Sequence, residues 1–314
     1  MLRVDHLEIG APQPGEVRIS VGAIGLNRVE CMFRHGLMGR PKLPSRIGYE
    51  AAGIIDAIGT DVEGFAAGDK VALLPGLSME EYGACADTVL YPANMLIKQP
   101  GNLSAEVAAA AWMQYLTAYA IVGVANAQRD EPIVITAASS SVGLAAIEIA
   151  NLMGAVPIAV TRTRTKVAAL LDHGARHVIV SDEDNLVERI RNLTAGKGAR
   201  VIFDAVAGDT VASLVEAAAA GGIVIVYGAL AGAVSTLPLP QIMLKGLTIR
   251  GYAMNDFMAD AKNRCRALEF VYFGLGTGKL NPIIDRVFAL EDIVEAYRYL
   301  ESNAQVGKVI VRAG

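Results

Sequence analysis

Three consecutive serines stand where an apolar segment, 132–136, gives way to a helical pattern. Small residues at such a junction let backbone N–H groups approach a pyrophosphate, and the helix dipole favours the negative charge. A single glycine remains of the usual dinucleotide pattern, so the motif alone fits an ordinary serine-capped helix equally well. Within a strand–helix–strand unit, it predicts that a dinucleotide binds at Ser139, Ser140, Ser141, Val142 and Gly143.

The second apolar segment of this region ends in cations instead of an acid. It reads AVTRTRTK, 159–166, and no acidic residue follows before Asp172. Folds that select NAD place an acid here to hold the ribose 2′-hydroxyl. Cations at a helix start are disfavoured by the dipole unless an anion is present, and a 2′-phosphate would supply one. The pattern therefore predicts an NADPH site, and a solvated basic turn is the alternative; the predicted residues are Thr161, Arg162, Arg164 and Lys166.

These sites need a parallel sheet to position them. From about residue 104, apolar runs alternate with amphipathic segments, which is typical of a parallel sheet covered on both faces. Residues 1–103 are instead rich in short β-type runs separated by glycine, proline and aspartate. We therefore predict an α/β protein with a doubly wound parallel-sheet domain over 104–251 and a β-rich domain over 1–103. Residues 252–314 are expected to complete the β-rich domain, because it lacks a closing strand.

Composition excludes several classes of function. The 314 residues are 53% hydrophobic and 19% charged with a net charge of −4, so a basic surface for nucleic acid is not expected. Cys31, Cys85 and Cys265 lie far apart, which predicts neither disulfides nor a thiolate metal cage and favours the cytoplasm. Two uncharged segments, 107–127 and 217–244, contain polar or helix-breaking residues, so we expect buried core and no membrane span.

Several segments together resemble the quinone oxidoreductase branch of the medium-chain dehydrogenase/reductases. The resemblance implies a GroES-like catalytic domain formed by both chain ends, an inserted Rossmann domain, and an active site in the cleft between them. It further implies cofactor contacts from Tyr227, Gly228 and Lys308, and from Asn27 on the nicotinamide side, although Asn27 could instead cap a turn. The segments that carry it are 14–36, 44–71, 112–120, the serine turn, 224–230 and 299–311.

The stretch IGYEAAGIIDAIGTDV, 47–62, resembles the G-H-E motif of the zinc-dependent enzymes in this superfamily, with Tyr49 in place of the histidine. The other two ligand positions hold Asn27 and Met113. None of the three replaces a zinc ligand well, so no metal is expected. Glu50 is predicted to be structural, anchoring an arginine such as Arg46, with a residual catalytic role as the alternative.

The predicted chemistry follows from the loss of zinc. Without a Lewis acid, an alkoxide lacks stabilisation, whereas hydride addition to a conjugated acceptor spreads the charge over an enolate. We therefore predict an NADPH-dependent reductase of quinones or enones, with Asn27, Tyr49 and Tyr115 as catalytic candidates. Met32 and Ser181 replace two tyrosines common in the family. A noncatalytic NADPH-binding protein is the alternative, and a zinc alcohol dehydrogenase is less favoured.

A homodimer is predicted from the run LTIRGY, 247–252. This run would form the last strand of the parallel sheet and leave an open edge, which natural proteins cover or pair. The family implies pairing of this edge across a two-fold axis.

Overall fold

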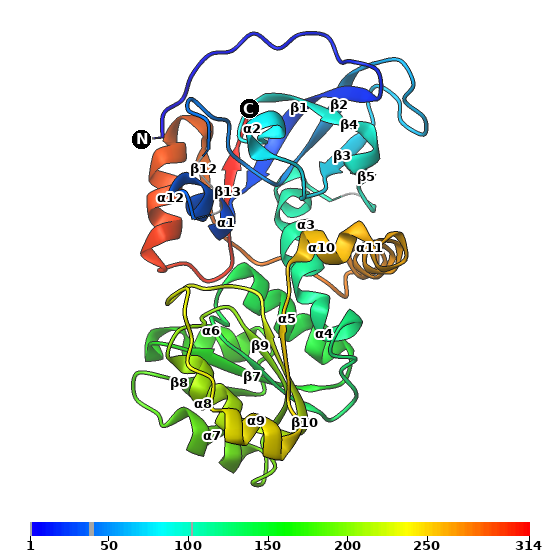
Figure 1. Cartoon of the computed structure of the whole chain (residues 1–314). Helices are drawn as coiled ribbons and strands as arrows, with labels where there is room; N and C mark the ends of the chain where they lie inside the picture. Colours follow the sequence, from blue (N-terminus) through cyan, green and yellow to red (C-terminus); the bar gives the residue numbers. More distant parts are fainter. Residues whose placement is uncertain (1, 38–40, 102) are drawn as a thin grey trace. The chain divides into compact units, whose positions relative to one another are not determined.

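The computed structural model describes residues 2–37, 41–101 and 103–314 (Figure 1). The chain forms two compact units, one comprising 1–113 with 275–314 and the other 114–274. Both boundaries fall within helices, α3 (Ala105–Ala118) and α11 (Ala261–Gly276). The boundaries predicted from the sequence, 103 and 252, precede these two helices.

The unit that contains both chain ends is built on a β-sheet. Among the described residues, seven strands join in the order β12-β13-β1-β2-β3-β5, with β4 also on β1. All pairs are antiparallel except β12 with β13. Strand β13 lies directly beside β1, with Ala23 opposite Arg312, so residues about 290 positions apart share this sheet. The strands are β1 (Glu16–Gly25), β2 (Ala51–Ile58), β3 (Lys70–Leu73), β4 (Thr88–Pro92), β5 (Leu96–Lys98), β12 (Ile284–Ala289) and β13 (Lys308–Arg312).

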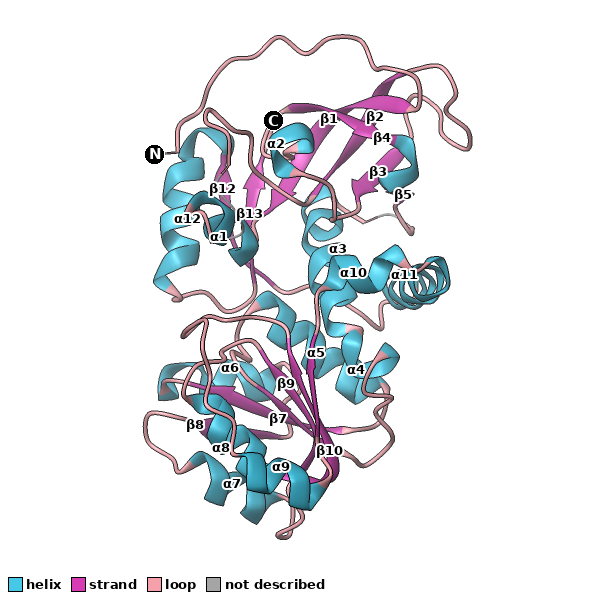
Figure 2. Cartoon of the chain, in the orientation of Figure 1, coloured by secondary structure: helices cyan, strands magenta, loops and turns pink. Residues whose placement is uncertain are grey.

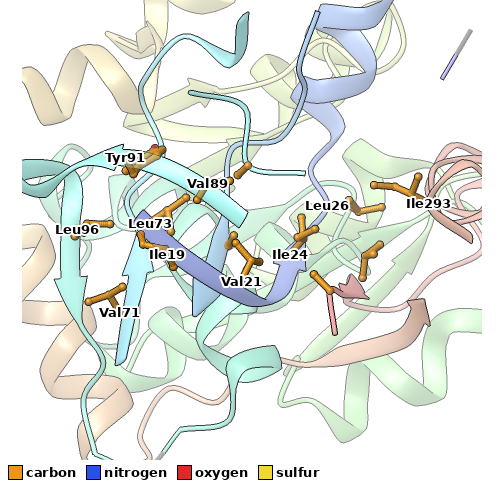
Figure 3. Close-up of a cluster of buried hydrophobic side chains, with 14 of the residues drawn as sticks. Ile19, Val21, Ile24, Leu26, Val71, Leu73, Val89, Tyr91, Leu96 and Ile293 are labelled. Carbon is orange, nitrogen blue, oxygen red and sulfur yellow. The ribbon is translucent and has the colours of Figure 1, made fainter. Parts of the chain in front are cut away.

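The core of this unit is built around β1. From Val17 to Ala23 alternate residues of this strand are buried, and Ile24 and Gly25 at its end are buried as well. They pack with residues of β3, β4 and β5 and with Ile293 at the start of α12 (Figure 3). The unit is β-rich and is formed by both chain ends, as predicted. Its other helices are α1 (Arg28–Arg34), α2 (Met79–Tyr82) and α12 (Ile293–Ser302), with short 3₁₀ turns at Ala93–Met95 and Leu290–Asp292.

The other unit contains six parallel strands in the order β11-β10-β9-β6-β7-β8. Counted along the chain this order is 6-5-4-1-2-3, the doubly wound Rossmann arrangement. Figure 2 labels four of these strands, β7, β8, β9 and β10. Strands β6 to β8 extend the sheet toward one edge and β9 to β11 toward the other, so the strand order switches between β6 and β9, where such sheets bind dinucleotides. The predicted parallel sheet is thus confirmed. Its strands are β6 (Pro132–Ile135), β7 (Val156–Thr161), β8 (His177–Val180), β9 (Ala199–Asp204), β10 (Ala218–Val226) and β11 (Thr248–Gly251).

Helices connect successive strands of this sheet, as the alternation of apolar runs and amphipathic segments predicted. The amphipathic segment 186–193 forms helix α7, and the amphipathic segment 142–153 nearly coincides with α5, which begins and ends one residue earlier. The helices are α4 (Ala120–Gly123), α5 (Ser141–Leu152), α6 (Val167–Asp172), α7 (Leu186–Leu193), α8 (Thr210–Ala217), α9 (Leu239–Lys245) and α10 (Met254–Ala259), with a 3₁₀ turn at Arg164–Lys166.

The two uncharged segments form ordinary elements of the fold. Residues 107–127 contribute α3 and α4, and 217–244 run through β10 and into α9. In the described part of the chain, no helix combines the length and apolar character needed to cross a bilayer.

Candidate functional site

The serine turn lies between β6 and α5, at the carboxyl end of the sheet. Ser140 caps α5, and its Oγ accepts a hydrogen bond from the Gly143 N–H at 3.1 Å. A Cβ on Gly143 would lie 2.6 Å from Ala138 Cα, so only glycine fits this close approach of helix and strand. The turn thus presents small side chains and a helix N-terminus beside the point, between β6 and β9, where the strand order switches. These features fit a pyrophosphate.

The three predicted basic residues after β7 lie in different surroundings. The Lys166 Nζ donates to Ser139 Oγ at 3.1 Å, which brings a cation to the serine turn. Arg164 instead pairs with Glu183, in the loop after β8. Arg162 is exposed and forms no ion pair within the described residues. Thr161 is buried at the end of β7, opposite Val180.

A buried aspartate organises the loop after β9. The Thr136 hydroxyl donates to Asp204 Oδ1 at 2.6 Å, and the same oxygen accepts the Val206 N–H at 3.0 Å. The other oxygen accepts the Ala207 N–H, also at 3.0 Å. Asp204 thus holds this loop at the carboxyl edge of the sheet. Asp204 was not among the predicted site residues, although an acid that directly follows the apolar run 201–203 is a recognisable signal.

Tyr227 and Gly228 stand beside that loop. The Tyr227 ring stacks on Phe203, with centroids 4.0 Å apart, and its N–H donates to the Asp204 carbonyl at 2.9 Å. Burial and then the Asp204 charge raise the pKa of the Tyr227 hydroxyl, while contact with Ser140 lowers it. A Cβ on Gly228 would lie 2.8 Å from the Ala205 carbonyl oxygen. These predicted residues therefore lie at the same edge of the sheet as the serine turn.

In the other unit, a lysine and a glutamate form a fully buried ion pair. The Lys308 Nζ donates to Glu50 Oε2 at 2.6 Å and to Asn27 Oδ1 at 2.7 Å, and the side chains of Lys308 and Glu50 are 0% exposed. The other Glu50 oxygen accepts the Met113 N–H at 2.9 Å. Two charges without water need such pairing and hydrogen bonds.

This pair corrects one prediction. Glu50 is anchored by Lys308 and not by Arg46, whose guanidinium donates to the Glu81 carbonyl at 3.4 Å. The physical reason is position: Arg46 belongs to an exposed loop, whereas Lys308 begins β13, which lies beside β1 in the sheet. Lys308 was predicted to bind the cofactor, and its ammonium is enclosed in this network.

Asn27 joins the ion pair to a second buried carboxylate. Its Nδ2 donates to the Gly25 carbonyl at 2.9 Å and lies 3.4 Å from Glu30 Oε1. Its backbone N–H donates to Glu30 Oε2 at 2.9 Å, so Glu30 closes the start of helix α1. The amide of Asn27 is thus hydrogen-bonded on both its oxygen and its nitrogen side.

Glu30 in turn holds two tyrosines. The Tyr297 hydroxyl donates to Glu30 Oε2 at 2.8 Å, and the Tyr49 N–H donates to Oε1 at 3.0 Å. Burial raises the pKa of Glu30, and these hydrogen bonds offset only part of the rise. Tyr49 is half-buried; desolvation and then the Glu30 charge raise the pKa of its hydroxyl. We call Asn27, Glu30, Glu50, Tyr297 and Lys308 the buried network.

The third catalytic candidate lies elsewhere. Tyr115 belongs to the Rossmann unit, where it is fully buried and its hydroxyl donates to Glu148 on α5. The structure therefore links two of the predicted catalytic residues, Asn27 and Tyr49, through Glu30. It places Tyr115 in a different hydrogen-bonded group.

Comparison with known proteins agrees with this architecture. The family model for the alcohol dehydrogenase GroES-like domain matches residues 13–117, and that for zinc-binding dehydrogenase matches 141–271. Quinone oxidoreductase 1 of Escherichia coli is 30% identical over 308 residues, which cover 96% of this chain and 92% of that protein. The chain belongs to the quinone oxidoreductase branch of the medium-chain dehydrogenase/reductases. The predicted resemblance is thereby confirmed.

Solved structures of this superfamily superpose closely on the chain. The E. coli quinone oxidoreductase crystallised with NADPH has a TM-score of 0.91 at 28% identity, covering 98% of this chain and 94% of that one. A structure described as an NAD-dependent alcohol dehydrogenase also has a TM-score of 0.91, at 31% identity, covering 99% and 95%. The fold alone therefore does not discriminate between the two nicotinamide cofactors.

In this member of the quinone oxidoreductase branch, the three positions that correspond to zinc ligands are all tied to the two buried carboxylates. Asn27 uses its backbone N–H and its side-chain amide, whereas Tyr49 and Met113 use their backbone N–H groups. Within the residues that the structure describes, no group of three or more His, Cys, Asp or Glu side chains is arranged to hold a metal ion.

Proposed function

We propose that this protein is an NADPH-dependent oxidoreductase that transfers a hydride to a quinone or an α,β-unsaturated carbonyl without zinc. The observation that carries the proposal is the buried network. In it, hydrogen bonds join the Asn27 amide, the Lys308 ammonium and the carboxylates of Glu50 and Glu30. A relative from Burkholderia, 26% identical over 322 residues, is named 2-haloacrylate reductase. An acrylate is a conjugated acceptor of the proposed kind.

The Rossmann unit offers a site of suitable chemistry for NADPH. We assign the pyrophosphate to the serine turn, which lies at the N-terminus of α5. We assign the 2′-phosphate to the basic loop after β7, with Lys166 at the turn and Arg162 exposed beside it. Bound there, NADPH would supply the hydride, and the protein would align it.

The remaining requirement is a donor for the oxygen of the acceptor. We assign this role to Tyr49, whose half-buried phenol is protonated at neutral pH and whose backbone is held by Glu30. Tyr115 is less suitable, since its hydroxyl already donates to Glu148. Asn27 is bonded on both sides of its amide, so we assign it a positioning role through Glu30, which holds the Tyr49 backbone.

The proposal is tested by NADPH consumption with quinones, enones and saturated aldehydes, with the metal content measured on the same sample. We expect reduction of the conjugated acceptors without stoichiometric zinc. Tyr49→Phe should lower kcat by about 100-fold or more, as loss of a positioned proton donor does, and should leave NADPH affinity unchanged. Tyr115→Phe is the matched control and should change kcat by less than about threefold.

Two results would contradict the proposal in different ways. One equivalent of tightly bound zinc that is essential for turnover would restore the alcohol dehydrogenase alternative. Binding of NADPH without reduction of any conjugated acceptor would instead favour a noncatalytic NADPH-binding protein.

We also propose a homodimer formed through the open edge of the Rossmann sheet. Strand β11 lies at that edge, and helix α9 before it has no buried residue. Val234, Met243 and Leu244 are 84%, 79% and 88% exposed, which is costly for a free surface in water. A second copy would pair β11 and cover these side chains together.

Light scattering at micromolar concentration should give twice the chain mass. Leu244→Glu should shift the protein toward the monomer, while Leu43→Glu, at an 82% exposed leucine of the other unit, should not. A monomeric wild-type protein would refute the dimer.

A further inference from the structure

The Arg164–Glu183 ion pair joins the basic loop to an acidic one. Arg164 Nε donates to Glu183 Oε2 at 3.0 Å, and Nη2 donates to the same oxygen. Both donors on that edge of the guanidinium therefore point at the carboxylate. Arginine uses the same pair of donors to bind the oxygens of a phosphate.

The sheet fixes the position of Glu183. Strands β7 and β8 pair in parallel up to Thr161 and Val180, and beyond them the Ser181 N–H donates to the Thr161 carbonyl at 2.8 Å. The loop after β8 thus starts beside the loop that carries the basic residues. Of its acids, Asp184 accepts the Val180 N–H at 2.8 Å, whereas Glu183 extends to Arg164.

The pair is exposed, so a stronger anion can compete with it. The side chains of Arg164 and Glu183 are 75% and 43% exposed. Exposed pairs typically stabilise a protein little, because water screens both charges. A phosphate monoester carries a charge of about −1.5 to −2 at neutral pH, more than a carboxylate. Binding of a 2′-phosphate to this loop would have to draw Arg164 away from Glu183 or leave the two anions side by side.

We propose that Glu183 is a cofactor-selectivity residue, which competes with the 2′-phosphate for Arg164 and thereby limits the preference for NADPH over NADH. The proposal rests on the assignment of the 2′-phosphate to the basic loop. Within that site it gives Lys166 and Arg164 different roles. Lys166 stays at the serine turn. Arg164 can bind the 2′-phosphate only when its ion pair with Glu183 opens, so a weaker ion pair leaves Arg164 free more often.

The experiment measures binding of two cofactor fragments by calorimetry, so it does not depend on turnover. The probes are 2′,5′-ADP, which carries the 2′-phosphate, and 5′-AMP, which does not. Glu183→Gln should bind 2′,5′-ADP about twofold to fivefold more tightly than the wild type, the range that an exposed ion pair spans. Its affinity for 5′-AMP should not change. Asp182→Asn removes the same charge from the same loop without an Arg164 contact, and should have a smaller effect.

The same substitution made in the Arg164→Ala variant isolates the contribution of the ion pair. Arg164→Ala should weaken 2′,5′-ADP binding and abolish the gain from Glu183→Gln. An equal gain with and without Arg164, or an equal gain from Asp182→Asn, would overturn the proposal. If the wild type binds 2′,5′-ADP but Glu183→Gln has no effect, the selectivity role fails while the site assignment stands. If neither protein binds 2′,5′-ADP, both fail.

Discussion

The two charged clusters of this protein use the same side-chain chemistry under opposite conditions. In the buried network, Lys308 meets Glu50 with no exposure to water, whereas in the Rossmann unit Arg164 meets Glu183 at the surface. Removal of one partner from a buried pair leaves a charge that neither water nor protein stabilises. At the surface, water replaces the lost partner. The first pair is therefore a requirement of the fold, and the second is free to take part in ligand selection.

The largest effect should come from Lys308→Met, which leaves Glu50 and Asn27 without their shared donor. We expect a loss of roughly 3 to 5 kcal/mol in the free energy of unfolding, the range for a broken buried ion pair. Urea titration of purified protein measures it. Lys98→Met, at an exposed lysine that pairs with Asp69, is the matched control and should cost less than about 1 kcal/mol. Similar losses for the two variants would show that the buried pair is not special.

An intermediate effect should appear in the pH dependence of stability. Below pH 4.5, the ordinary pKa of the carboxyl, Glu30 is protonated in both the folded and unfolded states. As the pH rises, the unfolded chain releases this proton first, because burial raises the pKa of Glu30 in the folded protein. Ionisation then favours the unfolded chain, so the Glu30 contribution to the free energy of unfolding falls until the pH passes the raised value.

Glu30→Gln should therefore show a smaller fall than the wild type between pH 4.5 and 7 in urea titrations. Glu106, which pairs with the exposed Arg312, is the control, and its contribution to the free energy of unfolding changes with pH in the opposite direction. A backbone hydrogen bond and then Arg312 lower the pKa of Glu106, so ionised Glu106 stabilises the fold above its ordinary pKa. Glu106→Gln should accordingly lose stability relative to the wild type as the pH rises toward 4.5, and should run parallel to it above that value. Parallel curves for all three proteins over the whole range, below and above pH 4.5, would contradict both assignments.

The smallest effect should be that of Arg164→Ala on folding. The free energy of unfolding should change by less than about 1 kcal/mol, because both partners of the pair are solvated. Urea titration beside Lys308→Met provides the comparison. A loss approaching that of the buried lysine would mean that the surface pair is structural, and its proposed role in cofactor selection would lose its basis.

The helices and strands of the Rossmann unit were predictable because their apolar residues recur with a clear period. Continuous apolar strands alternate with amphipathic helices, and this pattern places both the serine turn and the basic loop at the carboxyl edge of a parallel sheet. Strand β12 was not predicted, because its sequence has no such period. It lies at the edge of its sheet with most of its residues exposed, so it carries no alternation of apolar and polar positions.

Side-chain partners were harder to predict than elements. Glu50 was paired with Arg46 because the two are neighbours in sequence, whereas its partner Lys308 lies 258 residues away. The three basic residues after β7 look equivalent in sequence, yet one bonds to the serine turn and another to Glu183. Which partner a charge takes depends on which strands pair, and local periodicity does not contain that information.

The wide separation of Glu50 and Lys308 also matters during translation. At about 5 to 20 residues per second, roughly 13 to 52 s pass between synthesis of the glutamate and of its lysine. The whole Rossmann unit, 114–274, is made in that interval from one continuous stretch, and domains generally fold as units. On the ribosome, Glu50 therefore stays hydrated until β13 emerges. The sheet of the β-rich unit is begun before the Rossmann unit is made and is completed only after it.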